Sequence, residues 1–286
     1  MDTATLSEAR RELAHFLASR RARLTPEEVG LAPGRRRRVP GLRREEVAVL
    51  ANVSETWYTR LEQGQPINAS PDVLDAIAGA LRLDGYEREY LFSLTGRFGA
   101  GAVPAATSDL PPAIATTLEA FDRAPAVVYG PRWDVWLQNR AYIAVFGDIA
   151  QVPVARGNVV RQMFLDPSRR TLFPQWESVA RTLLQSFRIS AGRHAGDPAF
   201  AELIAGLRAE SPEFSAWWDE HDVVRRAIGE KRVAHPIAGT LILDHVALAF
   251  PDHPDVSLIV YTAPRNSESE RRLRRLSSGG NVGLRG

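Results

Sequence analysis

The sequence predicts an all-helical domain followed by a mixed α+β domain, and two changes of pattern along the chain indicate this division. Residues 6–96 hold five short segments in which apolar residues recur at helical spacing. Residues 97–110 are rich in Gly, Ala, Pro and Ser, a composition typical of a linker. Beyond the linker, helical segments alternate with runs of β-branched and aromatic residues, which predict strands.

The overall composition is that of a folded protein. The chain has 286 residues, of which 44% are hydrophobic and 24% charged, and its length suits about two domains. It has no cysteine, so disulfide and thiolate chemistry are excluded. No apolar run is long enough to span a membrane, and the first residues lack a signal core. We therefore expect a cytoplasmic protein without a membrane partner.

The basic residues are clustered along the chain. The net charge is only +2, but residues 20–44 hold nine arginines against Glu27 and Glu28. A concentrated positive field attracts polyanions, which an evenly spread charge does not. The run Arg35–Arg38 within this cluster is either a solvated loop or a set of contacts to nucleic-acid phosphates. Lys231 is the single lysine of the chain.

Capping signals define the helices of the first domain. A helix at 6–23 and a connector precede the helix at 43–51. Ser54 is in N-cap position for SETWYTRLEQG, which Gly64 closes as a C′ glycine. Ser70 caps the next helix, with a proline at its first position, and GYEREYLFSLTG is the fifth. These segments would share one small core.

Residues 43–64 predict a helix-turn-helix, in which two helices are joined by the turn NVS and the second can lie in a DNA major groove. A helical hairpin that packs only for stability would bury Val47, Tyr58 and Leu61 in the same way. The exposed arginines and the small turn favour DNA.

The segment REEVAVLANVSETWYTRLEQG resembles the phage-repressor-like helix-turn-helix class. With the preceding GRRRRVPGL and the later SPEFSAWWDEHDV, KRVAHPIAG and VYTA, the chain resembles the MmyB-like transcription regulators from about residue 10 to residue 264. This resemblance implies a bacterial, ligand-responsive regulator that binds a double-stranded DNA operator. It also implies a PAS-like second domain whose ligand is a fatty-acid-like or other small apolar molecule. Because repressor-type modules bind paired half-sites, we expect a homodimer.

The motif assigns DNA contacts to individual residues. The residues expected to contact base edges are Glu55, Thr56 and Arg60. Arg60 can bond a guanine, and Glu55 can accept from a cytosine amino group or pair with Arg44. An acid at position 55 departs from the basic or amide residue usual on this surface. The residues expected to contact phosphates are Arg35, Arg36, Arg37, Arg38, Arg43, Arg44, Ser54, Trp57 and Thr59.

The second domain is predicted to be α+β, with an antiparallel sheet assembled from both ends. AVVYG and WDVWLQN suggest a hairpin around Gly130-Pro131, and TLILDHVALAF and its neighbours predict three more strands. Long helices are expected at 171–191 and 198–209. Most aromatic residues here are expected in the core. The candidates for ligand-pocket walls are Trp136, Phe146, Phe164, Trp176 and Phe187. The candidates for polar anchors are Arg188 and His221.

Nothing in the sequence supports catalysis or a metal site. The histidines show no paired-ligand spacing, and no nucleophile elbow, phosphate loop or dinucleotide fingerprint follows a strand. We therefore expect no catalytic residue, no metal and no cofactor apart from a bound effector. Two other interpretations stay open. One is a non-catalytic sensor whose helical domain binds a partner protein, and the other is an enzyme acting on a small acid.

The expected boundaries are 1–96 for the helix-turn-helix domain and 97–110 for the linker. The PAS-like ligand-binding and dimerisation domain is expected at 111–264. The tail at 265–286 is rich in Ser, Gly and Arg, and we expect it to be disordered and solvated rather than a DNA contact.

Overall fold

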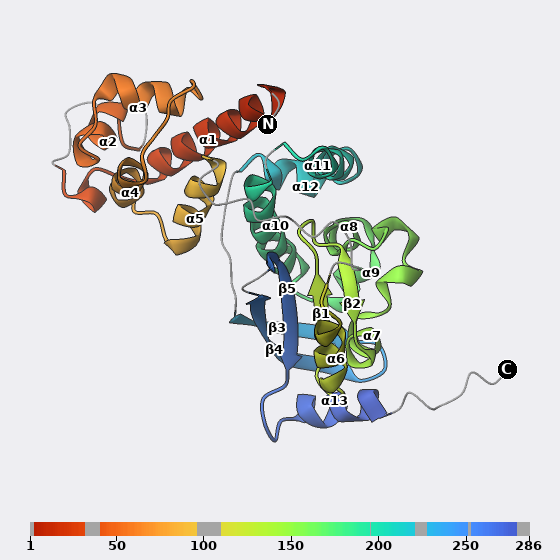
Figure 1. Ribbon diagram of the computed structural model, residues 1–286. Helices are drawn as coiled ribbons and strands as arrows, with labels where there is room; N and C mark the ends of the chain where they lie inside the picture. Colours follow the sequence, from red (N-terminus) through yellow and green to blue (C-terminus); the bar gives the residue numbers. More distant parts are fainter. Residues whose placement is uncertain are drawn as a thin grey trace. The chain divides into compact units, whose positions relative to one another are not determined.

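The computed structural model describes residues 3–31, 41–95, 110–194, 196–220, 228–250 and 253–278 (Figure 1). The chain divides into two compact units. Unit 1 comprises Met1–Ala100, Arg188–Gly206 and Ser215–Val224, and unit 2 comprises Gly101–Phe187, Leu207–Phe214 and Arg225–Gly286. The sequence predicts two contiguous domains. In the structure, unit 1 also includes two segments from the second half of the chain, and the boundaries of these segments fall within helices.

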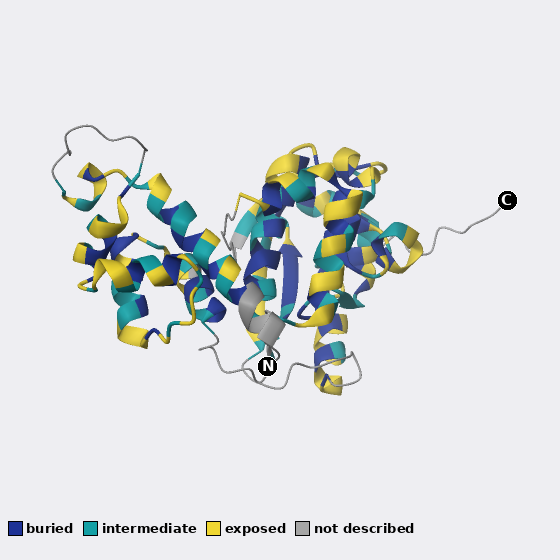
Figure 2. Cartoon of the chain, turned by 90° about the horizontal axis from the view of Figure 1, so that it is seen from above, coloured by how far each residue is buried: buried dark blue, intermediate teal, exposed yellow. Residues whose placement is uncertain are grey.

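Unit 1 contains the five predicted helices. They are α1 (Thr3–Arg23), α2 (Arg44–Leu50), α3 (Glu55–Glu62), α4 (Pro71–Ala80) and α5 (Gly85–Leu94), with a 3₁₀ turn η1 (Glu27–Val29) after α1. One apolar core joins them, with Phe16, Val47 and Tyr58 fully buried. Figure 2 shows how buried residues follow one side of these helices and exposed residues the other, the pattern expected of amphipathic helices around a core.

The predicted caps of unit 1 are confirmed. The hydroxyl of Ser54 accepts a hydrogen bond from the amide of Trp57 at 3.2 Å, and that of Ser70 accepts from Val73 at 3.4 Å. Gly64 has φ +68°, and a Cβ there would lie 2.9 Å from the carbonyl oxygen of Arg10. Glycine is therefore required at position 64 both by the backbone angle and by the closeness of α1.

Unit 2 is built on a five-stranded antiparallel sheet in the order β2-β1-β5-β4-β3. The strands are β1 (Ala126–Tyr129), β2 (Val135–Gln138), β3 (Ile228–His235), β4 (Gly239–Phe250) and β5 (His253–Thr262). The strands from both ends of the domain meet in one sheet, which confirms the predicted α+β fold. At the turn between β1 and β2, a Cβ on Gly130 would lie 2.4 Å from the indole ring of Trp136.

Helices and 3₁₀ turns fill the chain between β2 and β3. They are α7 (Arg140–Phe146), η3 (Ile149–Gln151), η4 (Pro153–Ala155), α8 (Val159–Leu165), α9 (Ser168–Leu172), α10 (Trp176–Arg193), α11 (Pro198–Glu210) and α12 (Pro212–Trp218), and α6 (Pro112–Ala120) precedes β1. The helix predicted at 171–191 starts later, at Trp176. Pro174 disfavours helical angles at Phe173, which is extended with φ −112° and ψ 99°.

The two faces of the sheet have different coverings. On the outer face, α6 packs against alternate residues of β1 and β5, among them Val128 and Leu258. The register places Tyr129 of β1 and Tyr261 of β5 on the opposite, inner face. Helix α7 packs on this inner face: the hydroxyl of Tyr142, a residue of α7, lies 3.0 Å from the hydroxyl of Tyr129 on β1.

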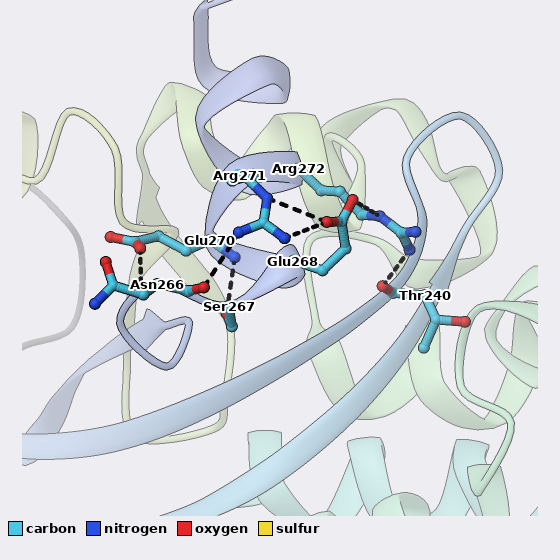
Figure 3. Close-up of polar contacts among 7 residues, drawn as sticks. All are labelled: Thr240, Asn266, Ser267, Glu268, Glu270, Arg271 and Arg272. Carbon is cyan, nitrogen blue, oxygen red and sulfur yellow. Dashed lines mark hydrogen bonds and ion pairs between the residues drawn. The ribbon is translucent and has the colours of Figure 1, made fainter.

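The prediction of a disordered tail is wrong for residues 265–278. These residues include the helix α13 (Glu268–Ser278), which packs against α7 and β4. Figure 3 shows Arg272 of this helix donating to the carbonyl oxygen of Thr240 on β4. Leu273 is 5% exposed, and the hydroxyl of Ser269 accepts a hydrogen bond from the amide of Ile242 at 2.9 Å. Residues 279–286 lie outside the described part of the chain.

Local charge pairs explain why such a polar segment is helical. Glu268 pairs with Arg271 and Arg272, three and four residues further on, and Glu270 pairs in the same way with Arg274 (Figure 3 shows the first two pairs). The amide of Glu270 donates to the hydroxyl of Ser267, which caps the helix. The arginines that suggested a solvated chain therefore stabilise α13.

Candidate nucleic-acid interface and ligand site

A tight turn sets the start of α3. Asn52 adopts a left-handed conformation with φ 53° directly after α2, as asparagine tolerates better than most residues. The amide of Val53 then donates to the carbonyl oxygen of Ala48 at 2.9 Å. The cap at Ser54 follows, so the direction of α3 is fixed by hydrogen bonds on both sides of the turn.

Helix α3 separates a buried face from an exposed edge. Tyr58 is 0% exposed and Leu61 is 2% exposed, as predicted for core residues. Glu55, Thr56 and Arg60, the three residues predicted to contact bases, are all exposed. Within the described chain neither Glu55 nor Arg60 has an ion-pair partner, so both side chains are available at this edge.

The residues predicted to contact phosphates fall into three groups. Exposed beside α3 are Arg43, Arg44 and Ser54. Half-buried on α3 itself are Trp57 and Thr59. Outside the described residues are Arg35, Arg36, Arg37 and Arg38.

A buried carboxylate connects α3 to α1 and α2. The side chain of Glu62 is 1% exposed and accepts hydrogen bonds from Nε of Arg21 at 2.7 Å and from Nε of Arg44 at 2.8 Å. Arg21 also donates to the carbonyl oxygen of Leu42 at 2.7 Å. Burial alone would raise the pKa of Glu62, but the hydrogen bonds and charges of the two arginines outweigh it and lower that pKa below its usual range.

This network corrects one expectation. Arg44 was a possible partner for Glu55, but its guanidinium bonds Glu62 instead. Glu62 follows Tyr58 by four residues and therefore shares its buried face, which is the sequence signal that could have revealed it. Arg44 remains 44% exposed, so it can bond Glu62 and still meet a phosphate.

The inner face of the sheet in unit 2 carries a group of aromatic side chains. The ring of Tyr261 lies 4.8 Å from that of Phe146 and 6.3 Å from that of Tyr142, between ring centroids. Phe146 also stacks on Phe173 at 6.2 Å. We call Tyr129, Tyr142, Phe146, Phe173 and Tyr261 the inner aromatic group.

The predicted pocket-wall residues do not form one group. Phe146 belongs to the inner aromatic group. Phe164 and Trp176 contact each other at 6.0 Å in a separate cluster with Phe214. Trp136 is partly buried and packs, together with its neighbour Leu137, against the residues of the outer face; the register between β1 and β2 shifts at this point. Phe187 is fully buried.

The two predicted anchors are placed differently. Arg188 lies in unit 1, where it is 0% exposed. It donates to a carboxylate oxygen of Glu12 at 2.9 Å and to the carbonyl oxygen of Trp218, and its guanidinium stacks 4.0 Å from the Trp218 ring. A guanidinium with these partners is not free to meet a ligand of unit 2, so the expected role of Arg188 as a ligand anchor is not supported. His221 lies outside the described residues.

Sequence reasoning missed a cation that lies at the inner aromatic group. Lys231, on β3, donates from Nζ to the hydroxyl of Tyr261 at 3.4 Å, and the same nitrogen is 5.4 Å from the centroid of the Tyr261 ring. Strand alternation could have placed it on the inner face together with Val233, but only the paired strands reveal its neighbour on β5.

The chain has an exposed helical edge that follows a tight turn and is flanked by arginines, and it also carries an α+β unit. These features define the class of two-domain helix-turn-helix proteins. Two family models match the chain. Residues 12–91 match a helix-turn-helix domain, and residues 110–276 match the MmyB-like transcription regulator ligand binding domain. The chain belongs to the family of MmyB-like transcription regulators. No curated protein sequence matches it.

The family supplies the general function. The protein is a transcription regulator with a DNA-binding and a ligand-binding domain, and both matched families are regulatory rather than catalytic. The second match extends into α13, so that this helix is part of the ligand-binding domain. None of the helices in the described part of the chain is long and apolar enough to cross a membrane.

Proposed function

We propose that this regulator binds its operator with the exposed edge of α3 in the major groove and that a small apolar molecule bound by unit 2 controls this binding. The observation that carries the proposal is the exposure of Glu55, Thr56 and Arg60 on a helix whose opposite face is buried. A guanidinium on such an edge can bond a guanine in bidentate fashion, and a carboxylate can accept from a cytosine amino group.

Phosphate contacts would hold the helix in register. Arg43 and Arg44 are exposed at the start of α2, and the hydroxyl of Ser54 stands at the start of α3. The run Arg35–Arg38 would add affinity that does not depend on sequence. Replacing this run with alanine is expected to lower the dependence of log K on log salt by up to about four, because each phosphate contact contributes about 0.9. An unchanged dependence would mean that the run is only solvated.

A homodimer would present two copies of α3 to paired half-sites about one helical turn apart. The ligand can regulate binding only if it favours one arrangement of the two copies over another. A fatty-acid-like molecule against the inner aromatic group suits this role, because the side chains there are apolar with a few hydroxyls.

The experiment is a selection of bound oligonucleotides from a random pool, followed by binding measurements on the selected operator. Arg60→Ala is expected to weaken specific binding by about 1–3 kcal/mol and to relax the preference at one base position of each half-site. Arg123→Ala is the control, since it removes the same charge from an exposed site in unit 2. Unchanged base preference in Arg60→Ala would remove this residue from the proposed interface.

Dimerisation and ligand are tested on the same protein. Sedimentation of the complex should give two chains for each operator, and a single chain would contradict the homodimer. Mass spectrometry of material that co-purifies with the protein should identify an apolar small molecule whose removal changes operator affinity. Equal affinity before and after its removal would contradict control by the ligand.

A further inference from the structure

Helix α10 contributes to both compact units without interruption. Its residues 176–187 belong to unit 2, and its residues 188–193 belong to unit 1. A buried stripe at four-residue spacing runs along the part in unit 2 and consists of Trp176, Ala180 and Leu184. The next residue at this spacing is the first residue of α10 that belongs to unit 1.

That residue is Arg188, whose side chain is fully buried. One terminal nitrogen of its guanidinium donates to a carboxylate oxygen of Glu12 at 2.9 Å, and the same oxygen accepts a hydrogen bond from the hydroxyl of Tyr90 at 2.7 Å. The other terminal nitrogen donates to the carbonyl oxygen of Trp218. Because Glu12 lies on α1, Tyr90 on α5 and Trp218 on α12, this group of hydrogen bonds joins α10 to all three helices within unit 1.

Further contacts attach the end of α10 to α5 and to the apolar core of unit 1. Ile189 is one of the buried residues of that core. The backbone of α10 at Gly192 lies so close to α5 that a Cβ there would be 2.5 Å from the ring of Tyr90. Arg193 forms an ion pair with Glu89, also on α5. The last turns of α10 are therefore a structural part of the DNA-binding unit.

Helix α1 connects this attachment to the helix that we propose to bind the operator. Arg21, about 14 Å further along α1 than Glu12, bonds the buried carboxylate of Glu62 on α3. The backbone of α1 also lies against the end of α3, where a Cβ on Gly64 would be 2.9 Å from the carbonyl oxygen of Arg10. Networks of hydrogen bonds joined by a stiff helix can carry energetic coupling between distant sites. A displacement of Glu12 would therefore be passed along α1 to α3.

We propose that α10 carries the effect of ligand binding from unit 2 to the operator-binding helix, with Arg188 as the positioning residue that links α10 to α1. This inference rests on the proposed function, in which a molecule bound by unit 2 controls operator binding. A ligand that favours one conformation of α10 then also favours one position of α1 and, through Glu62, one position of α3. Such coupling is reciprocal, so operator binding also acts on the part of α10 that belongs to unit 2.

Hydrogen exchange of the full chain, with and without the selected operator, tests this reciprocity. Openings of α10 that release Arg188 also loosen α1, so bound operator should suppress them. The amides of Ala180 and Leu184, in unit 2, should therefore exchange at least about fivefold more slowly with operator, which is the lower end of typical coupling between sites. Contacts that only stabilise unit 1 would slow exchange in unit 1 and leave these two amides unchanged.

Two variants and a control assign the effect to Arg188. Arg188→Met removes the link and should reduce the slowing at the two amides to less than about twofold. The double variant Glu12→Gln with Arg188→Met should do the same, and it keeps the test valid if the single variant does not fold, because it leaves no carboxylate without its partner. Arg181→Met is the matched control and should keep the slowing, because Arg181 bonds Glu177 within α10 itself.

Three outcomes would overturn the proposal. They are an unchanged rate at both amides when the wild type binds its operator, an undiminished slowing in both variants of Arg188, or an equally large loss of the slowing in Arg181→Met. The proposed function fails separately, if Arg60→Ala leaves the base preference unchanged while the wild type still shows the slowing. A chain that selects no oligonucleotide would contradict both.

Discussion

Replacing Glu62 with glutamine tests whether the helix-turn-helix is held in shape by one buried carboxylate. The carboxylate joins three helices through Arg21 and Arg44, and glutamine keeps its shape but removes the charge. Arg21 would then remain 18% exposed without a charged partner, and one of its donors would face an amide nitrogen.

The expected loss of stability in Glu62→Gln follows from how exposed the two ion pairs of Glu62 are. Breaking a buried ion pair costs about 3–5 kcal/mol, and an exposed pair contributes about 0–1 kcal/mol. The pair with Arg21 is close to the first case and the pair with Arg44, which is 44% exposed, is closer to the second. Since glutamine keeps part of the hydrogen bonding, we expect Glu62→Gln to cost about 2–4 kcal/mol.

Hydrogen exchange of the full chain is the suitable assay, because it measures the local stability of α3 without assuming that both units unfold together. The amides of Tyr58 and Leu61 should exchange about 30- to 900-fold faster in Glu62→Gln, as the expected free energy dictates. Glu45→Gln removes an exposed pair with Arg43 and should leave exchange unchanged. Equal exchange in the two variants would refute the reasoning.

The same carboxylate predicts a dependence on pH. The pKa of Glu62 is lower in the folded protein than in the unfolded chain. Its stabilisation of α3 is therefore fully present above the unfolded value of about 4.3 and is lost as the pH falls through the folded value. Protection of the α3 amides should fall in acid in the wild type and much less in Glu62→Gln. A parallel fall in both proteins would assign the acid sensitivity to other groups.

Three further substitutions test the local structure. Ser54→Ala removes the cap of α3 and should lower the stability of unit 1 by about 1 kcal/mol in hydrogen exchange, whereas an unchanged α3 would contradict its capping role. Gly130→Ala places a methyl group against the Trp136 ring and should destabilise unit 2 by about 1–3 kcal/mol in urea, and full stability would show that the ring can move away. Leu273→Ala opens a gap under α13 and should cost about 2–4 kcal/mol in the same assay, whereas no loss would mean that α13 does not contribute to the core of unit 2.

The sequence predicted most elements because their signals are local. Ser54, Gly64 and Ser70 act within a few residues of their own positions, so a capping pattern is enough to place a helix boundary. The helix α13 was missed although Ser267 and the acid three residues later form a capping pattern, because its low apolar content resembled a disordered tail.

Among the functional residues, too, those with local signals could be predicted from the sequence and those with distant partners could not. The exposed edge of α3 follows from helical spacing alone. The roles of Glu62, Arg188 and Lys231 depend on distant partners, since Arg21 and Glu62 are 41 residues apart and Glu12 and Arg188 are 176 apart. The pattern of apolar residues within one segment cannot predict a contact between residues so far apart in the sequence. For the same reason Arg188 looked like a ligand anchor, whereas the structure gives it partners in unit 1.

Methylation interference on the selected operator tests most directly whether the edge formed by Glu55, Thr56 and Arg60 enters the major groove. Dimethyl sulfate modifies guanine N7 in the major groove and adenine N3 in the minor groove. We predict interference at guanine N7 in two clusters about one helical turn apart, and loss of the interference at one guanine of each half-site in Arg60→Ala. Interference confined to adenine N3, or a pattern unaffected by Arg60→Ala, would contradict the placement of α3 in the groove.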